Sequence, residues 1–406
     1  MKKYALVGAG ARALHMFAKP LTEEFQEKAR LVGVCDVNPI RAERLSEDCG
    51  KVPVYTEFDR MLTESGAEII IVAVPDHLHH VYVVSALEAG CDVITEKPMT
   101  IDAEKCQAIL EAERRTGRSV KVTFNCRFMP HMARIKQLLK DGAIGTIRSI
   151  HMEWSLDGVH GADYFRRWHR RMENSGGLLV HKSTHHFDLI NWWLEDEPEE
   201  LYAYGLRNVF GEGRRPHGER CLTCTHTTSC EFYYDITKDE FAKRYYREAE
   251  EEDGYLRDAC VFVEEIDILD TFSVNVKYSG GTLLTYSLST NSPYEGWKVA
   301  IQGTKGKLEA EEYYSGPHAA EPPPAIKLYN RRNERILYES PRSPGAHGGG
   351  DSRLRAMLFE GGSSDPLGQL AGAWAGAMSL LIGAAANRSI REGRPIAVKE
   401  LLKGKG

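Results

Sequence analysis

The stretch Lys3–Ala13, which reads KYALVGAGARA, decides the fold of the first part of the chain. A short β-prone run ends at Val7 and leads into a glycine-containing turn and a helix-like segment. Gly8 permits a tight turn after a strand, and Gly10 lets the backbone approach a pyrophosphate at the helix N-terminus. Small Ala13 allows the helix to pack closely on the strand. The stretch therefore predicts the first strand, turn and helix of a dinucleotide-binding domain.

A second strand supports this interpretation and indicates which dinucleotide binds. The apolar run 31–35 ends at Asp36, about 20 residues after the glycine loop. A carboxylate at this position suits the ribose hydroxyls of NAD and would repel the 2′-phosphate of NADP. We therefore expect NAD as the cofactor, with NADP disfavoured.

Strands and helices continue to alternate over the first 125 residues. After the strand 31–35, the predicted strands span 68–74, 92–95 and 120–124, and the predicted helices span 41–48 and 81–89. Such alternation, with continuous apolar runs as strands, predicts an α/β fold with a doubly wound parallel sheet. In these sheets, ligands bind beyond the carboxyl ends of the strands. The residues at those ends are Gly8, Asp36, Pro75, Lys97 and Asn125.

Composition places the chain among ordinary globular proteins. Its 406 residues are enough for two domains, and 42% of them are hydrophobic and 27% charged. A net charge of −6 gives no reason to expect nucleic acid or an anionic membrane as a partner. No apolar run reaches the roughly 18 residues of a membrane span, and the first run is too short for a signal peptide. Nine cysteines without a secretion signal predict reduced thiols and a cytoplasmic location.

Several motifs resemble those of the glucose–fructose oxidoreductase / inositol dehydrogenase / MocA (Gfo/Idh/MocA) family. The matching segments are Gly8–Arg12, Pro75–His79, Glu96-Lys97-Pro98, Asn125-x-Arg127, the Gly-Gly…His-x-x-Asp segment Gly176–Asp188, and His347–Asp351. Glu96-Lys97-Pro98 at a strand end is the most specific of them. The resemblance covers nearly the whole chain, with one long departure at about 208–260, which we call the insertion.

The resemblance implies two domains. Residues 1–125 would form an NAD-binding Rossmann domain, and residues 126–406 a substrate-binding and oligomerisation domain. The second domain would be built on a large, open, mostly antiparallel sheet that covers the nicotinamide. An open sheet of this kind makes a homodimer or homotetramer the expected assembly.

The second half of the sequence agrees with this expectation. Segments that alternate like strands with one wet face lie at 151–154, 199–206, 268–278, 282–290 and 298–302. Gly280-Gly281 reads as a hairpin turn between two of them. The alanine-rich segment 371–387 predicts a tightly packed closing helix.

The segment Asn174–Trp193, NSGGLLVHKSTHHFDLINWW, holds three histidines within six residues. Read as one helix, it puts His181, His185 and Asp188 on one stripe, with His186 pointing elsewhere. From the residues alone, such a stripe can be a proton-transfer face, half of a metal site or a hydrogen-bonded packing seam.

The resemblance implies catalytic roles for two side chains. Hydride transfer from a secondary alcohol to NAD needs a base for the hydroxyl proton and a positive group near the developing alkoxide. In the family, a lysine of the Glu-Lys-Pro motif and a histidine of the His-x-x-Asp helix share this work, which assigns it to Lys97 and His185. A partly buried, cofactor-facing lysine would have a lowered pKa, which suits proton transfer. Asp188 is expected to be a supporting residue.

His181 is where the sequence departs from the family pattern. The family usually has an aspartate at this position, and a glycine where this chain has Ser183. Histidine adds a group that titrates near neutrality and cannot stabilise a neighbouring cation when protonated. One interpretation makes His181 a second catalytic acid/base, as redox-assisted elimination on a sugar would need. Another is a metal ion held by His181 and His185.

The other candidate binding residues come from the strand ends and the resembling motifs. The predicted cofactor-binding residues are Gly8, Gly10, Ala11, Arg12, Asp36, Pro75, His77, His79, Glu96, Lys97 and Asn125. The predicted substrate-binding residues are Arg127, Trp154, Trp168, His186 and His347. Four arginines around Trp168, at 166, 167, 170 and 171, indicate either an anionic or polyhydroxylated ligand nearby or an exposed face.

The insertion contains a cysteine cluster. Cys221-x2-Cys224 followed by Cys230 is a spacing that suits structural zinc, with His217 or His226 as a fourth ligand. Three reduced thiols or a disulfide are the alternatives. The following segment, 238–253, is highly charged and reads as an exposed helix or loop. Together with the cysteine cluster it forms an insertion whose expected position is over the substrate mouth or on a partner surface.

Together these features predict an NAD-dependent oxidoreductase that transfers hydride between nicotinamide and a hydroxyl-bearing carbon of a sugar, polyol or glycoside. Two alternatives stay open. One is a redox-assisted glycosidase or lyase with tightly bound NAD, and the other is a non-catalytic NAD-binding sensor.

Overall fold

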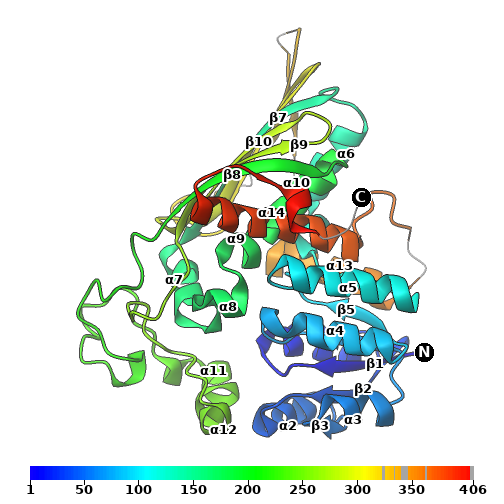
Figure 1. The fold of residues 1–406 in the computed structure, drawn as a ribbon, viewed down its shortest axis with the longest axis vertical. Coiled ribbons are helices and arrows are strands. Elements are labelled where there is room, and N and C mark those ends of the chain that lie inside the picture. The colour runs from blue at the N-terminus through cyan, green and yellow to red at the C-terminus, as the bar shows by residue number, and fades with distance from the viewer. Residues whose placement is uncertain (322–324, 333, 340–345, 362–363, 403–406) are drawn as a thin grey trace.

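Two β-sheets with helices around them form the framework of the protein (Figure 1). The computed structural model describes residues 1–321, 325–332, 334–339, 346–361 and 364–402. The first sheet has seven strands in the order β15-β6-β5-β4-β1-β2-β3. The second has nine strands in the order β14-β13-β12-β11-β7-β10-β9-β8-β16.

The first sheet is built almost entirely from the N-terminal part of the chain. Its strands are β1 (Lys2–Val7), β2 (Ala29–Cys35), β3 (Val54–Tyr55), β4 (Ile69–Val72), β5 (Asp92–Thr95), β6 (Val120–Val122) and β15 (Ala371–Gly372). The pairs among β1 to β6 are parallel, and β15 joins β6 in the antiparallel direction. The predicted doubly wound parallel sheet is confirmed.

Helices connect these strands. They are η1 (Ala13–Ala18), α1 (Lys19–Glu23), α2 (Pro39–Asp48), α3 (Phe58–Glu64), η2 (Asp76–Leu78), α4 (His79–Glu88), α5 (Ala103–Thr116) and η3 (Asn125–Phe128). Two of the longer ones begin at side-chain caps, since Asn38 accepts from Arg41 N and Asp102 from Lys105 N. The central strand β4 is buried along its whole length, as its continuous Ile-Ile-Ile-Val run predicts.

The second sheet is long, open and mostly antiparallel. Its strands are β7 (Ile147–Asp157), β8 (Pro198–Leu206), β9 (Thr271–Tyr278), β10 (Leu283–Ser292), β11 (Gly296–Gly303), β12 (Gly306–Tyr313), β13 (Ile326–Asn330), β14 (Arg335–Tyr338) and β16 (Ile396–Ala397). Only the β10–β7 pair within this sheet is parallel among the described strands. The predicted fold class is thereby confirmed for both sheets.

Helices cover one face of the second sheet and leave the other open. The helices of this part of the chain are α6 (Pro130–Lys140), α7 (Gly158–Arg166), η4 (Trp168–Arg170), α8 (Met172–Ser175), α9 (Leu178–His181), α10 (Thr184–Leu194), η8 (Ala346–Gly349), α13 (Gly350–Phe359), α14 (Ala373–Glu392) and η9 (Val398–Leu401). Among them, α13 packs on η1 and η3 of the first half of the chain. The helix α14 packs on β8 and on α9 and α10. No helix in the described part of the chain is both long enough and apolar enough to cross a membrane.

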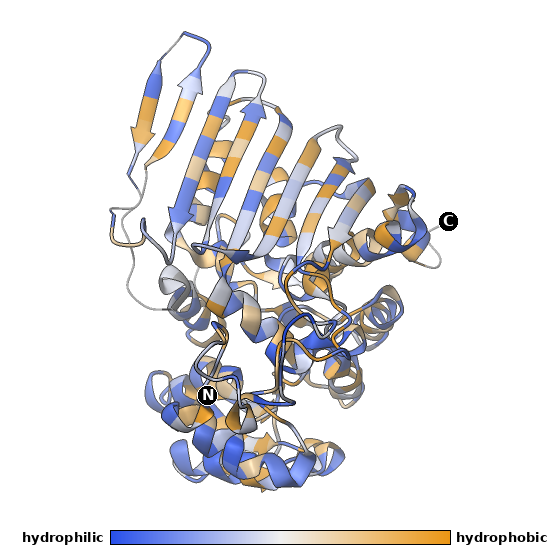
Figure 2. Ribbon diagram, turned by 90° about the vertical axis from the view of Figure 1, so that its left-hand side faces the viewer, coloured by the Kyte–Doolittle hydropathy of each residue, from blue (hydrophilic) through white to orange (hydrophobic). Residues whose placement is uncertain are grey.

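Burial along the strands follows the alternation that the sequence predicts. In β9, Phe272, Val274 and Val276 are buried, while Ser273 and Lys277 are exposed on the opposite face. Figure 2 shows hydrophobic and hydrophilic residues alternating along the strands of this sheet.

The insertion lies beside the first sheet. Its elements are η5 (Cys221–Thr223), η6 (Ile236–Lys238), α11 (Glu240–Tyr245), η7 (Arg247–Ala249) and α12 (Glu250–Asp253). The helices α11 and α12 lie next to α2 (Figure 1). The expectation of a simply exposed charged segment is wrong for α11, because Ala242 and Tyr245 are buried and Arg244 pairs with Asp48 of α2.

Candidate active site

One cavity, of about 470 Å³, lies at the carboxyl ends of the parallel strands. Its wall combines those strand ends with residues of α7, η4, α9 and α10, so it lies between the two halves of the chain. The predicted site residues found in the wall are Gly8, Gly10, Ala11, Arg12, Asp36, Pro75, His79, Glu96, Lys97, Asn125, Trp168, His181 and His185. Residues far apart in the sequence are thus brought to one cavity.

The glycine loop forms one end of this cavity. Gly8 has φ +99°, and a Cβ there would lie 2.4 Å from the carbonyl oxygen of Ala73, so only glycine fits. The Asp36 carboxylate accepts hydrogen bonds from Ala9 N at 2.7 Å and Asn38 N at 2.8 Å. These bonds fix the carboxylate beside the loop, at the position where the ribose of a dinucleotide is recognised in Rossmann folds.

A buried network ties the strand ends to one another. Arg12 donates from Nε to Glu96 at 2.7 Å and from its terminal nitrogens to Asp351 at 3.0 and 3.2 Å. Asn125 Nδ2 donates to the same Asp351 carboxylate at 2.7 Å. The sequence predicts Arg12, Glu96 and Asn125 as cofactor-binding residues. Their hydrogen bonds also join the glycine loop and the ends of β5 and β6 to Asp351 of α13.

Lys97 projects from the end of β5 into the middle of the cavity wall. Its Nζ donates to the backbone carbonyl oxygen of His181 at 3.1 Å. Burial lowers the pKa of Lys97 to about 8, against the opposite effect of the nearby Asp76 carboxylate. A lysine with this pKa can exchange a proton near neutrality.

Asp76 and His181 form a short hydrogen bond in the same wall. His181 Nδ1 lies 2.5 Å from Asp76 Oδ2, and both side chains are buried. Burial raises the pKa of Asp76 well above its usual value and lowers the pKa of His181 well below. The rings of Tyr164, Trp168 and His169 pack around His181. Burial therefore opposes charge on both partners, while the nearby Lys97 ammonium group favours the charged carboxylate of Asp76.

The segment Asn174–Trp193 is not one continuous helix, which corrects the single-helix interpretation. The chain forms α8, α9 and α10 in succession, and α9 ends at His181 while α10 begins at Thr184. Ser183 N donates to the carbonyl oxygen of Leu178, which gives a wider turn at the break. His181 and His185 still both reach the cavity wall, where the ring of His185 meets Phe124 edge-on at 6.2 Å.

Some predicted residues lie outside the cavity wall. Arg127 binds Asp188 through two hydrogen bonds of 2.6 and 2.7 Å, and both side chains are buried. His186 is fully buried, where its Nδ1 lies 2.7 Å from the Tyr286 hydroxyl and its ring stacks on Trp154 at 3.8 Å. Asp188 is thus paired with Arg127, and the Trp154 ring stacks on His186; none of these four residues lines the cavity.

Two further candidates have other placements. His77 lies in η2, next to Asp76, but is not part of the cavity wall. The side chain of His347 falls outside the described residues, so its predicted substrate contact stays a prediction.

Other residues of the wall were not among the predicted site residues. Asp76 and Lys182 lie in motifs that the sequence marks, one beside Pro75 and the other between His181 and His185. Tyr246, Asp253 and Tyr255 come from the insertion, and no local pattern connects them with the glycine loop.

The part of the insertion at 240–255, which we call the covering segment, lies over the glycine loop. The Tyr246 hydroxyl accepts a hydrogen bond from Ala11 N at 3.1 Å. Asn38 Nδ2 donates to the carbonyl oxygen of Ala249 at 2.9 Å, and Arg41 pairs with both Asp36 and Asp253. The covering segment thus lies at the cofactor end of the cavity, which corrects the expected position over the substrate mouth, while its place on a partner surface stays a prediction.

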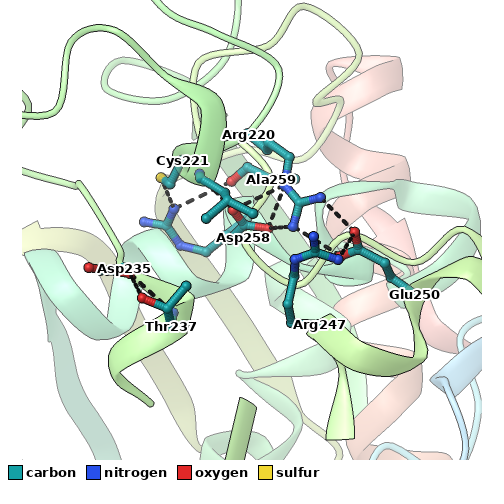
Figure 3. Close-up of polar contacts among 10 residues, drawn as sticks. Arg220, Cys221, Asp235, Thr237, Arg247, Glu250, Asp258 and Ala259 are labelled. Atoms are coloured by element: carbon teal, nitrogen blue, oxygen red, sulfur yellow. Dashed lines mark hydrogen bonds and ion pairs between the residues drawn. The ribbon is translucent and has the colours of Figure 1, made fainter. Parts of the chain in front are cut away.

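A network of ion pairs joins Arg247 and Glu250 of the covering segment to Arg220 and Asp258 (Figure 3). Arg220 donates to Asp258 at 3.0 and 3.2 Å from Nε, and to Glu250 at 3.0 Å from each terminal nitrogen. Arg247 donates to the same Glu250 carboxylate at 2.6 Å. Asp258 is fully buried, and these hydrogen bonds provide partners for its carboxylate oxygens.

The cysteines of the insertion are free thiols in the structure. Cys221 Sγ accepts a hydrogen bond from Arg166 at 3.0 Å, and Cys224 Sγ accepts one from His226 N at 3.4 Å. Burial raises the pKa of Cys260, and the nearby thiols of the cluster raise it further. Within the described ranges, no group of three or more His, Cys, Asp or Glu side chains is arranged to hold a metal ion.

Comparison with known proteins identifies the family. Residues 2–124 match the NAD-binding Rossmann fold of the Gfo/Idh/MocA oxidoreductase family, and residues 136–398 match its C-terminal α/β domain. The chain belongs to the Gfo/Idh/MocA family. The predicted resemblance is confirmed, and with it an NAD-binding Rossmann domain.

Individual relatives of this Gfo/Idh/MocA protein agree. YteT of Bacillus subtilis (strain 168), named as an oxidoreductase, is 39% identical over 99% of both chains. An inositol 2-dehydrogenase of Rubrobacter xylanophilus is 29% identical over 45% of this chain and 49% of its own length. A solved structure of levoglucosan dehydrogenase, in complex with NADH and L-sorbose, is 18% identical and covers 98% of each chain with a TM-score of 0.70. That last likeness concerns the fold alone.

Proposed function

We propose that this protein is an NAD-dependent oxidoreductase that transfers hydride between nicotinamide and a hydroxyl-bearing carbon of a sugar, polyol or glycoside. The observation that carries the proposal is that Lys97 and His185 line the same cavity as the glycine loop. Relatives named inositol 2-dehydrogenase support a polyhydroxylated substrate.

The chemistry follows from what an alcohol must lose. Oxidation removes a hydride from carbon and a proton from the hydroxyl oxygen, and NAD, when bound, supplies the hydride acceptor. Neutral Lys97 takes the hydroxyl proton, because its pKa of about 8 leaves a share of the amine unprotonated at slightly alkaline pH. His185 faces the same space and donates a hydrogen bond to the oxygen as negative charge develops there.

His181 acts in this proposal through Lys97. Its backbone carbonyl accepts the Lys97 Nζ hydrogen bond, and its ring is held by Asp76. His181 thereby positions the amine, and the Asp76–His181 pair provides a second place for a proton beside the substrate. We propose no metal ion at His181 and His185.

The cofactor in this proposal is NAD and not NADP. The Asp36 carboxylate is held at the end of β2 by two backbone N–H groups, so it keeps its place when a nucleotide enters. A 2′-phosphate would lie against this negative charge.

Substitution of Lys97 tests the proposal. Lys97→Ala should lower the rate of NADH formation, followed at 340 nm with a panel of sugars and polyols, by about 10²- to 10⁴-fold. NADH binding, followed by its fluorescence, should persist. Exposed Lys28→Ala is the matched control and should keep both properties. NADH formation that Lys97→Ala leaves unchanged would show that the proposed mechanism is wrong.

A second candidate function is favoured by the covering segment. Because this segment bonds to the glycine loop and to α2, bound NAD would leave slowly, as a redox-assisted glycosidase or lyase with recycled NAD requires. Two results would favour this reaction: release of NAD or NADH from the purified protein on denaturation, and consumption of substrate without net formation of NADH. A non-catalytic sensor is disfavoured, since Lys97 and His185 are both present in the wall.

We also propose a homodimer or homotetramer, with a cytoplasmic location. In the described part of the chain, one face of the second sheet carries no helix, and exposed residues alternate with buried ones along its strands (Figure 2). Light scattering on the purified protein tests the assembly, and a monomer at working concentration would contradict it.

A further inference from the structure

Lys182 occupies the break between α9 and α10, between the two histidines of the cavity wall. Lys182 is only 9% exposed and is one of the residues that line the cavity. Nζ lies 5.4 Å from the centre of the Trp154 ring. Among the described residues, no carboxylate oxygen lies within 4.0 Å of Lys182 Nζ. A nearly buried lysine of the cavity wall is thus without an ion-pair partner among the described residues.

The neighbouring charges do not supply that partner. Glu295 is the carboxylate whose charge reaches Lys182, and it is already bonded to His160 at 2.8 Å. Asp76, the carboxylate at this end of the wall, is bonded to His181. The two carboxylates therefore have closer partners than Lys182.

Other cations add to the positive charge at this end. Lys97 bonds to a backbone carbonyl and not to a carboxylate. Arg167 bonds to Asp163 at 3.1 Å, but its buried Nε has no hydrogen-bond partner. The part of the cavity around Lys97, which we call the substrate end, therefore holds more cationic groups than carboxylates free to pair with them. The part around the glycine loop, the cofactor end, carries Asp36 and Asp253.

Physical chemistry makes this arrangement informative. Burial lowers the pKa of Lys182, because an ammonium group away from water loses solvation. Contact with the Trp154 ring offsets part of that loss. A ligand that brings a negative charge would offset it further and would form a charge-assisted hydrogen bond in a partly dry cavity. A neutral sugar offers no such compensation.

We propose that Lys182 binds the carboxylate of an acidic sugar, so that uronic acids and their glycosides are the substrate class of this site. The inference rests on the proposed function, because it takes the hydroxyl that is oxidised to lie at Lys97 and His185. A uronic acid carries its carboxylate and its ring hydroxyls on one pyranose. One sugar can therefore contact Lys182 through its carboxylate and Lys97 and His185 through a hydroxyl. Lys182 is then the residue that separates acidic from neutral sugars.

Matched pairs of sugars test the inference. D-Glucuronate against D-glucose, and D-galacturonate against D-galactose, differ at the carboxylate and little elsewhere. We expect kcat/KM for the uronate to exceed that for its neutral partner by about 10- to 100-fold, the range of a hydrogen bond to a charged group. Lys182→Met, which keeps the length and apolar stem, should remove most of this ratio, mainly through KM. Lys28→Met is the surface control and should keep the ratio.

Binding gives a readout that does not depend on turnover. Each sugar is titrated into the enzyme–NADH complex and followed by NADH fluorescence, for the wild type and for Lys182→Met. The inference is overturned if neither uronate binds more tightly than its neutral partner to the wild type, or if folded Lys182→Met keeps the preference. Failure of the proposed function is a separate result: a uronate preference in binding with no NADH formed from any sugar.

Discussion

His181 Nδ1 lies 2.5 Å from Asp76 Oδ2, which links the last residue of α9 to the first residue of η2 across the cavity wall. In the resembling family, an aspartate usually stands where this chain has His181. In this chain Asp76, from the other half of the chain, supplies a carboxylate near Lys97. Because Asp76 favours the charged form of Lys97, the pair is coupled to the proposed base.

The first prediction concerns the pH dependence of the wild-type enzyme. Burial lowers the pKa of Lys97 to about 8, and only its neutral form can accept the hydroxyl proton. kcat/KM for oxidation should therefore rise with pH through about 8 and level off above it. Initial rates at 340 nm from neutral to alkaline pH measure this. A profile that falls across this range would contradict the assignment of Lys97 as base.

The second prediction follows from the charge of Asp76. Asp76→Asn removes a negative charge that favours protonated Lys97, so the pKa of Lys97 should fall further. The rise in kcat/KM should then begin at lower pH than in the wild type. Asp59→Asn, an exposed carboxylate on α3, is the control and should leave the profile in place. An unmoved profile in Asp76→Asn would show that the pair is not coupled to Lys97.

The third prediction concerns the choice of cofactor. Asp36→Ser removes the carboxylate that would oppose a 2′-phosphate and leaves Arg41 nearby. The ratio of kcat/KM for NAD to that for NADP should fall by roughly tenfold, which corresponds to about 1.4 kcal/mol. Steady-state kinetics with both cofactors measure the ratio. If the wild type uses NAD and NADP equally well, Asp36 does not determine the choice between the two cofactors.

The first sheet could be predicted from the sequence because its strands are short apolar runs that the local pattern marks. The run Ile69–Val72 is buried throughout, and β5 begins and ends where its sequence pattern predicts. The strand β15 was not predictable, because Ala371–Gly372 looks like the start of a helix and joins β6 only through tertiary pairing. Tertiary contacts decide such short pairings, and local propensity does not.

The site was predictable where a residue ends a strand. Gly8, Asp36 and Lys97 all line the cavity, since parallel strands deliver their carboxyl ends to one edge. The break before Ser183 was hidden, because periodicity alone cannot locate a widened helical turn. The contact of Tyr246 with Ala11 spans 235 positions of sequence, and no local pattern encodes it.

The fourth prediction concerns the covering segment. Asp253 pairs with Arg41 beside the cofactor end of the cavity. Asp253→Ala should loosen the covering segment and speed the release of NADH, measured by stopped-flow fluorescence after mixing with excess NAD. Glu251→Ala removes an exposed charge from the same helix and should leave the release rate unchanged. Equal release rates in the wild type and both variants would mean that the segment does not retain the cofactor.

The last prediction concerns the buried pair of Arg127 and Asp188. Their side chains are 6% and 1% exposed, and two hydrogen bonds of 2.6 and 2.7 Å join them. Arg127→Met leaves the Asp188 carboxylate buried without its cation, which should cost about 3–5 kcal/mol of stability. Calorimetry should therefore show a melting temperature lower by several degrees. Arg388→Met, which breaks an exposed pair with Glu392, is the control and should melt close to the wild type. The double variant Arg127→Met/Asp188→Leu should recover much of the loss, because it removes both charges together. A double variant as unstable as Arg127→Met alone would assign the effect to lost packing and not to the unpaired carboxylate.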